Sequence, residues 1–181
     1  MSQGSDGGHD SRRARDFAPA ADPEPTENDR NHGSNDNPAS GEHGGNGGQA
    51  DTYLLYQRGL SLLERGSAAA AAQLLERAAA AEPQSRSVLE ALARAQFDAG
   101  WYAEAAGNFR RIVEASPTDD YAQFGLGLSL ARTGDPGAAA EHLALAAAMR
   151  PNLRHYTDAL RSVRATLSAR NRLREERQID K

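Results

Sequence analysis

The sequence predicts an all-α protein, a solenoid built from antiparallel helix pairs. The first observation is an internal period of 34 residues, at which proline, glycine and alanine recur. The recurring columns are Pro83, Pro117 and Pro151; Gly66, Gly100 and Gly134; and Ala71, Ala105 and Ala139. The second observation is that alanine-rich sequence with helical spacing fills the interval between each glycine and the next proline. A period of this length is typical of stacked helix pairs.

Each 34-residue unit is predicted to contain two helices that meet at its glycine. In the first unit we expect helices over about 52–65 and 67–82. Gly66 turns the chain between them, and Pro83 ends the second helix because proline cannot continue the amide ladder. In the third unit, Asp135 followed by proline is a good start for the second helix. The predicted units are 52–85, 86–119 and 120–153.

Small residues are expected where the two helices of a unit approach each other. One such column is Gly59, Ala93 and Gly127, and another is the alanine column described above. Larger side chains one turn along are expected to fill the space that the small residues leave: Leu75, Phe109 and Leu143. A large residue at Gly127 should overpack this contact, at a cost on the order of 1 to 3 kcal/mol.

The segment 1–51 differs from the rest of the chain in composition. It is rich in Gly, Asp and Asn, it has almost no large apolar residues, and its 10 acidic residues outnumber its 4 arginines. Such a composition cannot bury enough apolar surface to offset the loss of chain entropy, so we expect a disordered acidic tail. The run Arg12-Arg13-Ala14-Arg15-Asp16-Phe17 is the one candidate docking motif within it.

The segment 154–181 is predicted to cap the array with one amphipathic helix that starts near Asn152. Its apolar residues step by three or four positions: Leu153, Tyr156, Leu160, Val163 and Leu167. Beyond Leu167 the apolar stripe stops and arginines follow, so we expect this end to project or fray. From residue 150 to 177 the chain carries 8 arginines against 3 acidic residues.

The spaced pattern as a whole resembles the tetratricopeptide repeat proteins over residues 52–153. In the second unit the pattern comprises Leu89, Leu92, Ala93, Gly100, Tyr102, Ala105, Phe109 and Pro117; in the third it comprises Leu126, Gly127, Leu130, Gly134, Ala139, Leu143, Ala146 and Pro151. The departures are Arg58, Gln96 and Gln123 at usually apolar sites and Ile112 at a small-residue site. They suggest local repacking. The resemblance implies a right-handed stack of three repeats.

Tetratricopeptide arrays typically bind peptides on a concave surface lined by the first helix of each unit. Applied to this chain, the resemblance implies a groove rich in aromatic and apolar side chains around one central arginine. The predicted groove residues are Tyr53, Tyr56, Leu60, Leu63, Arg94, Phe97, Tyr121, Phe124 and Leu128. Aromatic anchors around an arginine are typical of binding hot spots. The carboxylate clamp of the family, which uses Lys and Asn on these faces, is absent.

No constellation of catalytic residues occurs, so we expect no enzyme activity and no cofactor. The sequence has no phosphate-binding glycine loop, no HExxH pair and no nucleophile elbow. It has no cysteine, and His9, His32 and His43 lack metal-ligand spacing, so we expect no metal site. No apolar run is long enough to span a membrane. A cytoplasmic protein is the default expectation, and the excess of arginine and alanine suggests a bacterial coding sequence.

The leading hypothesis is therefore a scaffold that holds an apolar or aromatic-bearing peptide or helix of a partner protein in the groove. Three alternatives stay open at this point. The apolar face of the first helix, including Leu54, could form a homodimer. The basic helix over 161–177 could make weak, salt-sensitive contact with nucleic acid. The acidic tail could occupy the groove of its own chain.

Overall fold

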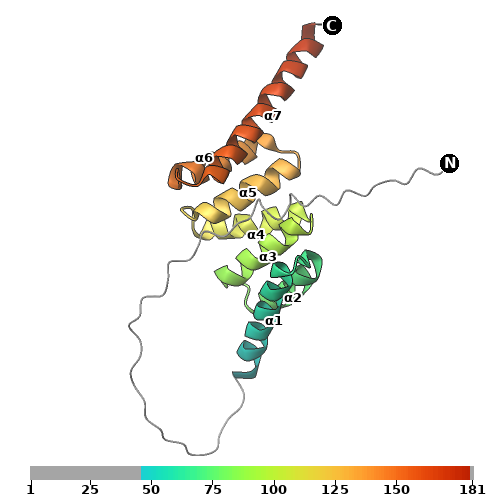
Figure 1. Cartoon of the computed structure of the whole chain (residues 1–181), viewed down its shortest axis with the longest axis vertical. Helices are drawn as coiled ribbons and strands as arrows, with labels where there is room; N and C mark the ends of the chain where they lie inside the picture. The colour runs from blue at the N-terminus through green and yellow to red at the C-terminus, as the bar shows by residue number, and fades with distance from the viewer. Residues whose placement is uncertain (1–45, 180–181) are drawn as a thin grey trace, which may run out of the picture.

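The computed structural model describes residues 46–179, and within that range the chain is helical throughout apart from short turns. The seven helices are α1 (Asn46–Glu64), α2 (Ala68–Ala81), α3 (Arg86–Asp98), α4 (Tyr102–Ala115), α5 (Asp120–Arg132), α6 (Pro136–Met149) and α7 (Arg154–Ile179). Consecutive helices pack against each other along the whole array. They form a stack that runs from α1 at one end to α7 at the other (Figure 1).

The predicted turns at the recurring glycines are confirmed. The three recurring glycines all adopt positive φ, of 75°, 85° and 90° at Gly66, Gly100 and Gly134. Residues with a β-carbon rarely adopt this conformation, which explains why the column is glycine. At the helix starts, the Asp119 and Asp135 carboxylates accept hydrogen bonds from the backbone N–H of Ala122 and Ala138. These caps satisfy donors that the first helical turn leaves unpaired.

The close approach between paired helices is also confirmed. A β-carbon built on Gly59 would lie 2.5 Å from Leu75 Cγ, and one built on Gly127 would lie 2.7 Å from Leu143 Cγ. Leu75 and Leu143 are fully buried, as is Phe109 at the same position of the second unit. One contact was not predicted: Gly125 of α5 packs directly on the Phe109 ring of α4, so this glycine joins two neighbouring units.

Two of the unusual polar residues are accommodated by hydrogen bonds. Gln96 is 6% exposed, and its Oε1 accepts from Asn108 Nδ2 at 2.8 Å. Gln123 is 3% exposed; its Nε2 donates to the Pro117 carbonyl at 2.9 Å, and its Oε1 lies 2.7 Å from His142 Nδ1. Burial lowers the pKa of His142, which favours the neutral ring that this contact uses. The local repacking predicted at these two sites therefore consists of hydrogen bonds between polar side chains and to the backbone.

The first helix begins earlier than the sequence predicted. It starts at Asn46, so residues 46–51 are helical and their assignment to the disordered tail was wrong. Packing of α1 on α2 fixes the later turns, and adding a turn to an existing helix costs little compared with starting one. Thr52 lies buried where the boundary was expected, with its hydroxyl donating to the Gly48 carbonyl at 2.8 Å. Residues 1–45, including the 12–17 motif and the three histidines, lie outside the described range.

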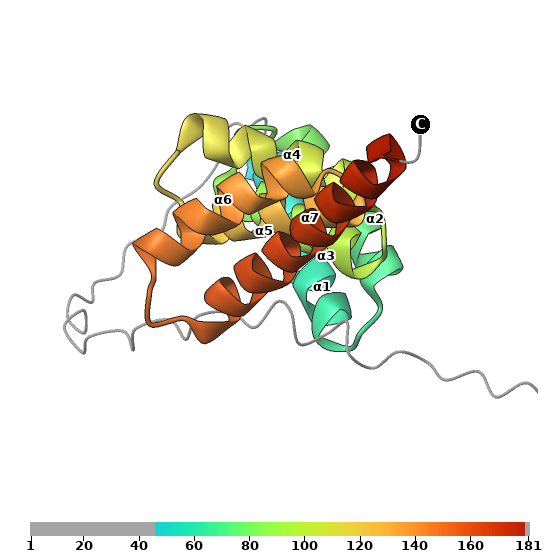
Figure 2. The ribbon, with the colours of Figure 1, turned by 90° about the horizontal axis from the view of Figure 1, so that it is seen from above.

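The capping helix α7 matches its predicted apolar stripe. Tyr156 and Val163 are buried, and Leu153, Leu160 and Leu167 are partly exposed. The helix starts at Arg154 and continues to Ile179, so it does not fray after Leu167. Its distal half projects beyond the other helices (Figure 1), and the view along the stack shows α7 lying across the C-terminal end (Figure 2). No helix within residues 46–179 combines the length and the apolar composition needed to cross a membrane.

Candidate functional site

A groove of about 480 Å³ opens across the first helices of the units. It is lined by residues of α1 and α3, by residues 119–121 at the start of α5, by Arg150 after α6 and by Tyr156 of α7. Five of the predicted groove residues line it: Tyr56, Leu60, Leu63, Arg94 and Tyr121. They come from three different helices, so the 34-residue period brings together residues that are distant in the sequence.

The other four predicted groove residues lie elsewhere. Phe124 and Leu128 line a second hollow of about 440 Å³ between α5 and α7, together with Val163. Tyr53 is 60% exposed on α1, and its hydroxyl accepts a hydrogen bond from Gln57. Phe97 is only 4% exposed and packs edge-on against Tyr102 of α4, with ring centroids 5.1 Å apart. Placing Phe97 among surface anchors was therefore wrong, because this ring belongs to the core between α3 and α4.

The groove is more highly charged than the sequence predicted. Besides Arg94, it is lined by Arg86 and Arg150 and by the carboxylates of Glu90, Asp119 and Asp120. The expectation of an apolar surface with one central arginine was wrong on this point. That expectation left out Asp119, Asp120 and Arg150, which lie at helix ends and also line the groove.

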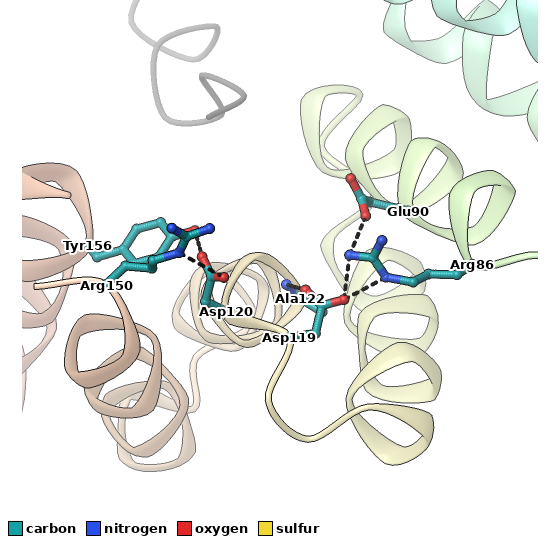
Figure 3. Close-up of polar contacts among 7 residues, drawn as sticks. All are labelled: Arg86, Glu90, Asp119, Asp120, Ala122, Arg150 and Tyr156. Carbon is teal, nitrogen blue, oxygen red and sulfur yellow. Dashed lines mark hydrogen bonds and ion pairs between the residues drawn. The ribbon is translucent and has the colours of Figure 1, made fainter. Parts of the chain in front are cut away.

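Asp119 connects the third unit to the second. Its carboxylate accepts from Arg86 Nε at 2.7 Å and also caps α5 through the Ala122 backbone N–H at 3.0 Å (Figure 3). Arg86 in turn lies 3.2 Å from Glu90 on the same helix. Hydrogen bonding to Asp119 raises the pKa of Arg86, as expected for a cation held by carboxylates.

Asp120 connects the third unit to the cap. It accepts from Arg150 Nε at 3.3 Å and from the Tyr156 hydroxyl at 3.0 Å (Figure 3). Burial, and then the Asp120 charge, raise the pKa of Tyr156, so this phenol stays protonated and can donate. The two adjacent aspartates thus face opposite neighbours, one toward α3 and one toward α7. Together they connect α5 to α3 on one side and to α7 on the other, along the edge of the groove.

Arg94 differs from the other two arginines of the groove. Its nearest carboxylate is Asp98 Oδ2, 3.9 Å from Nε, which is at the limit of an ion pair. Within residues 46–179 its Nε atom is buried without a hydrogen-bond partner, so a ligand cannot reach that atom. The side chain as a whole is 31% exposed, and a guanidinium carries four further N–H donors, so the exposed part of Arg94 can still meet a ligand.

Aromatic rings frame the groove on both sides of Arg94. Burial raises the pKa of Tyr121 strongly and that of Tyr56 less, so both phenols are neutral at physiological pH. On the α7 side, Phe124 stacks on Tyr156 with centroids 4.4 Å apart, and His155 packs edge-on against Phe124. This aromatic group lies between the groove and the second hollow, because Tyr156 lines the first and Phe124 lines the second.

Several groove residues were missed by the sequence reasoning although a signal existed. Arg86 and Asp120 are one period apart, at the first position of successive first helices. Opposite charges one period apart indicate contact between units, and it is Asp119, the neighbour of Asp120, that makes this contact with Arg86. The pair Asp119–Asp120 shortly after Pro117 also marks a helix start. Arg150 could not have been predicted in the same way, since its approach to Asp120 depends on the turn between α6 and α7.

The arrangement favours binding rather than chemistry. Among residues 46–179 no group of three or more histidine, cysteine or carboxylate side chains is placed to hold a metal ion. The charged groups of the groove pair mainly with one another, as in a structural network. The features that remain available to a ligand are the apolar faces on α1 and α5 and the donors of Arg94.

Comparison with known protein families settles the nature of the array. A family model described as tetratricopeptide repeat matches residues 56–120 and 91–153, which together cover more than half of the chain. The chain belongs to the tetratricopeptide repeat family. Members of this family are in general interaction modules without enzyme activity. No curated protein matches the chain in sequence.

Solved structures share the fold at low sequence identity. The first tetratricopeptide domain of Spaghetti (RPAP3), bound to the HSP90 peptide SRMEEVD, aligns with a TM-score of 0.61 and 18% identity, covering 66% of this chain and 94% of that chain. The Sgt2 domain from Aspergillus fumigatus aligns with a TM-score of 0.61 and 20% identity, covering 67% and 82%. MamA MSR-1 also gives 0.61, at 22% identity, covering 67% and 70%. These similarities confirm the right-handed solenoid of helix pairs.

Proposed function

We propose that this protein is a non-enzymatic scaffold that binds a peptide segment of a partner protein in the groove across α1, α3 and α5. The observation that carries the proposal is the groove itself, a hollow of about 480 Å³ lined by side chains from every first helix of the array. A related fold, the first domain of Spaghetti (RPAP3), holds a peptide of HSP90. Which peptide this chain binds depends on the residues that line its own groove.

The lining of the groove supports a peptide with both apolar and polar contacts. Tyr56 and Leu60 are partly exposed on one wall, where they can cover an apolar side chain. Arg94 offers donors next to them, and the exposed Ser87 leaves room at the wall of α3. Partly buried aromatic and apolar side chains beside an arginine are typical of binding hot spots.

A steric block tests this function without disturbing the core. Ser87 is exposed and lines the groove, so Ser87→Trp should fill it. Gln73 is exposed on α2 and is not among the residues that line the groove, so Gln73→Trp is the matched control. Peptides selected from a random library on the full chain should lose at least ten-fold in affinity with Ser87→Trp and keep wild-type affinity with Gln73→Trp. Equal binding to both variants would refute the groove. Alanine at Phe97 or Phe124 is unsuitable, because both rings are buried.

A second candidate function is self-association through α1. Tyr53 is 60% and Leu54 53% exposed on this helix, and both are large apolar side chains. Such residues next to each other on the first helix of an array are suited to packing against a second copy. Light scattering of the full chain distinguishes the two: a dimer that Leu54→Glu dissociates supports self-association, and a monomer at micromolar concentration removes it.

A further inference from the structure

Three residues at equivalent positions of successive units form a row across the array. Leu60, Arg94 and Leu128 are 34 residues apart, one in each of α1, α3 and α5. All three are partly exposed; Leu60 and Arg94 line the groove, and Leu128 lines the second hollow. The first helices of neighbouring units contact each other directly, so the row crosses the surface from helix to helix. Its order is apolar, cationic, apolar.

The central position of this row has unused binding capacity. Arg86 is held by Asp119 and Glu90, and Arg150 is held by Asp120. Within residues 46–179, the ion pair of Arg94 is the long 3.9 Å contact with Asp98, and 31% of its side chain is exposed. The carboxylates of Asp119 and Asp120 are already engaged by arginine, backbone or tyrosine donors. A charged ligand that enters here therefore meets an available cation, and a carboxylate is its complement.

The two outer positions have apolar surroundings. Leu60 lies with Tyr56 and Leu63 along the wall of α1. Leu128 shares its hollow with the apolar residues Ala131, Ala159 and Val163; polar residues, among them Arg132 and Asp158, line the same hollow. A ligand side chain placed at either outer position would bury apolar surface, which stabilises binding by roughly 25 cal/mol per Å² of apolar area removed from water.

The distance between neighbouring helices determines how many residues of a bound peptide separate its contacts with successive positions of the row. Axes of packed helices lie about 8 to 10 Å apart, and an extended chain advances about 3.3 Å per residue. Neighbouring positions of the row therefore correspond to about three residues of an extended ligand. We propose that the groove and the second hollow together select an extended peptide with an acidic residue at Arg94 and an apolar residue about three positions away on each side. This inference rests on the proposed peptide-binding function and specifies its ligand.

A helical ligand would require a different pattern. Because a helix rises about 1.5 Å per residue, the same row would be matched by residues about six positions apart. The two spacings are distinguishable in the sequences of selected peptides. The pattern is symmetric about the acidic residue, so it applies to either direction of the chain across the groove.

Selection from a library of random twelve-residue peptides on the full-length protein tests the inference. The wild type should enrich peptides with Asp or Glu at the centre and apolar residues three positions before and after it. Arg94→Glu should replace the central acid by Lys or Arg, and Arg94→Gln should abolish the preference for either charge. Arg77→Glu is the control, because Arg77 is exposed on α2 and its substitution changes the net charge by the same amount as Arg94→Glu. The fold of each variant is checked by circular dichroism.

Affinities of one selected peptide, labelled with fluorescein, complete the test. Replacing its central acid by Gln should weaken binding to the wild type about ten-fold, since hydrogen bonds to charged groups are the strong ones. The same replacement should have less than two-fold effect on Arg94→Gln. Selected peptides that lose affinity for Ser87→Trp but carry no central acid, or that show the six-residue spacing, overturn this inference and leave the proposed function standing. Peptides that Ser87→Trp still binds overturn both.

Discussion

The glycine that joins the second and third units provides a quantitative test of the packing. A β-carbon on Gly125 would lie 2.6 Å from Cε1 and 2.7 Å from Cε2 of Phe109, and nearer still to Cζ. Carbon atoms prefer separations of about 3.5 to 4.0 Å, so the ring would have to move by about 1 Å. Phe109 is fully buried, so its ring can move only by displacing its neighbours in the core. We expect Gly125→Ala to overpack the contact, at a cost of about 1 to 3 kcal/mol.

The control is Gly107→Ala, in the middle of α4. A β-carbon there has no neighbour within 4 Å, so this variant reports only the helix propensity of alanine, which favours the folded state by up to about 1 kcal/mol. Urea denaturation followed by circular dichroism should therefore place Gly125→Ala below Gly107→Ala by the full overpacking cost. Phe109→Leu, which shortens the ring to a smaller side chain, should reduce that difference. Equal stabilities for the two alanine variants would refute the reasoning.

Two further predictions concern the polar edge of the groove and the tyrosines. Asp120→Ala removes the acceptor of the buried Tyr156 hydroxyl, which should cost about 1 to 3 kcal/mol and accelerate hydrogen exchange in the first turns of α7; Arg150→Ala breaks only an exposed pair and should cost under about 1 kcal/mol. Exchange that is equally fast in both variants contradicts this role for Asp120. Burial raises the pKa of Tyr121 and Tyr156, whereas unfolded tyrosine ionises near pH 10. Stability should thus be complete below pH 10 and fall above it, because only the unfolded chain releases these protons. Complete tyrosine ionisation near pH 10 in the folded protein, measured by ultraviolet absorbance, would contradict this prediction.

The positions of the helices could be predicted from local signals. Gly66, Gly100 and Gly134 adopt the positive φ that the turns require, and each turn lies where the glycine column predicted it. Asp135 caps α6, as the aspartate followed by proline indicated. The start of α1 could not be predicted in this way, because residues 46–51 have the composition of the tail and are helical as an extension of a packed helix.

The groove was predictable only in part, since a sequence period places residues on a helix face but does not say how deep they lie. Phe97 and Arg94 are three residues apart on α3, yet Phe97 is buried against Tyr102 and Arg94 reaches the groove. That difference depends on how closely α4 approaches. The second hollow likewise depends on tertiary packing, because residues of both α5 and α7 line it.

The sequence by itself determined the repeat length, the helix ends at the glycine turns and the small-residue contacts, because these depend on conformational preferences and side-chain volumes that each residue carries with it. Only the tertiary structure decided the charge of the groove. The contacts of Arg86 with Asp119 and of Arg150 with Asp120 join residues about thirty positions apart across turns. Which arginine those contacts leave available, Arg94, depends on the distances between side chains of different helices, and stacking sets those distances.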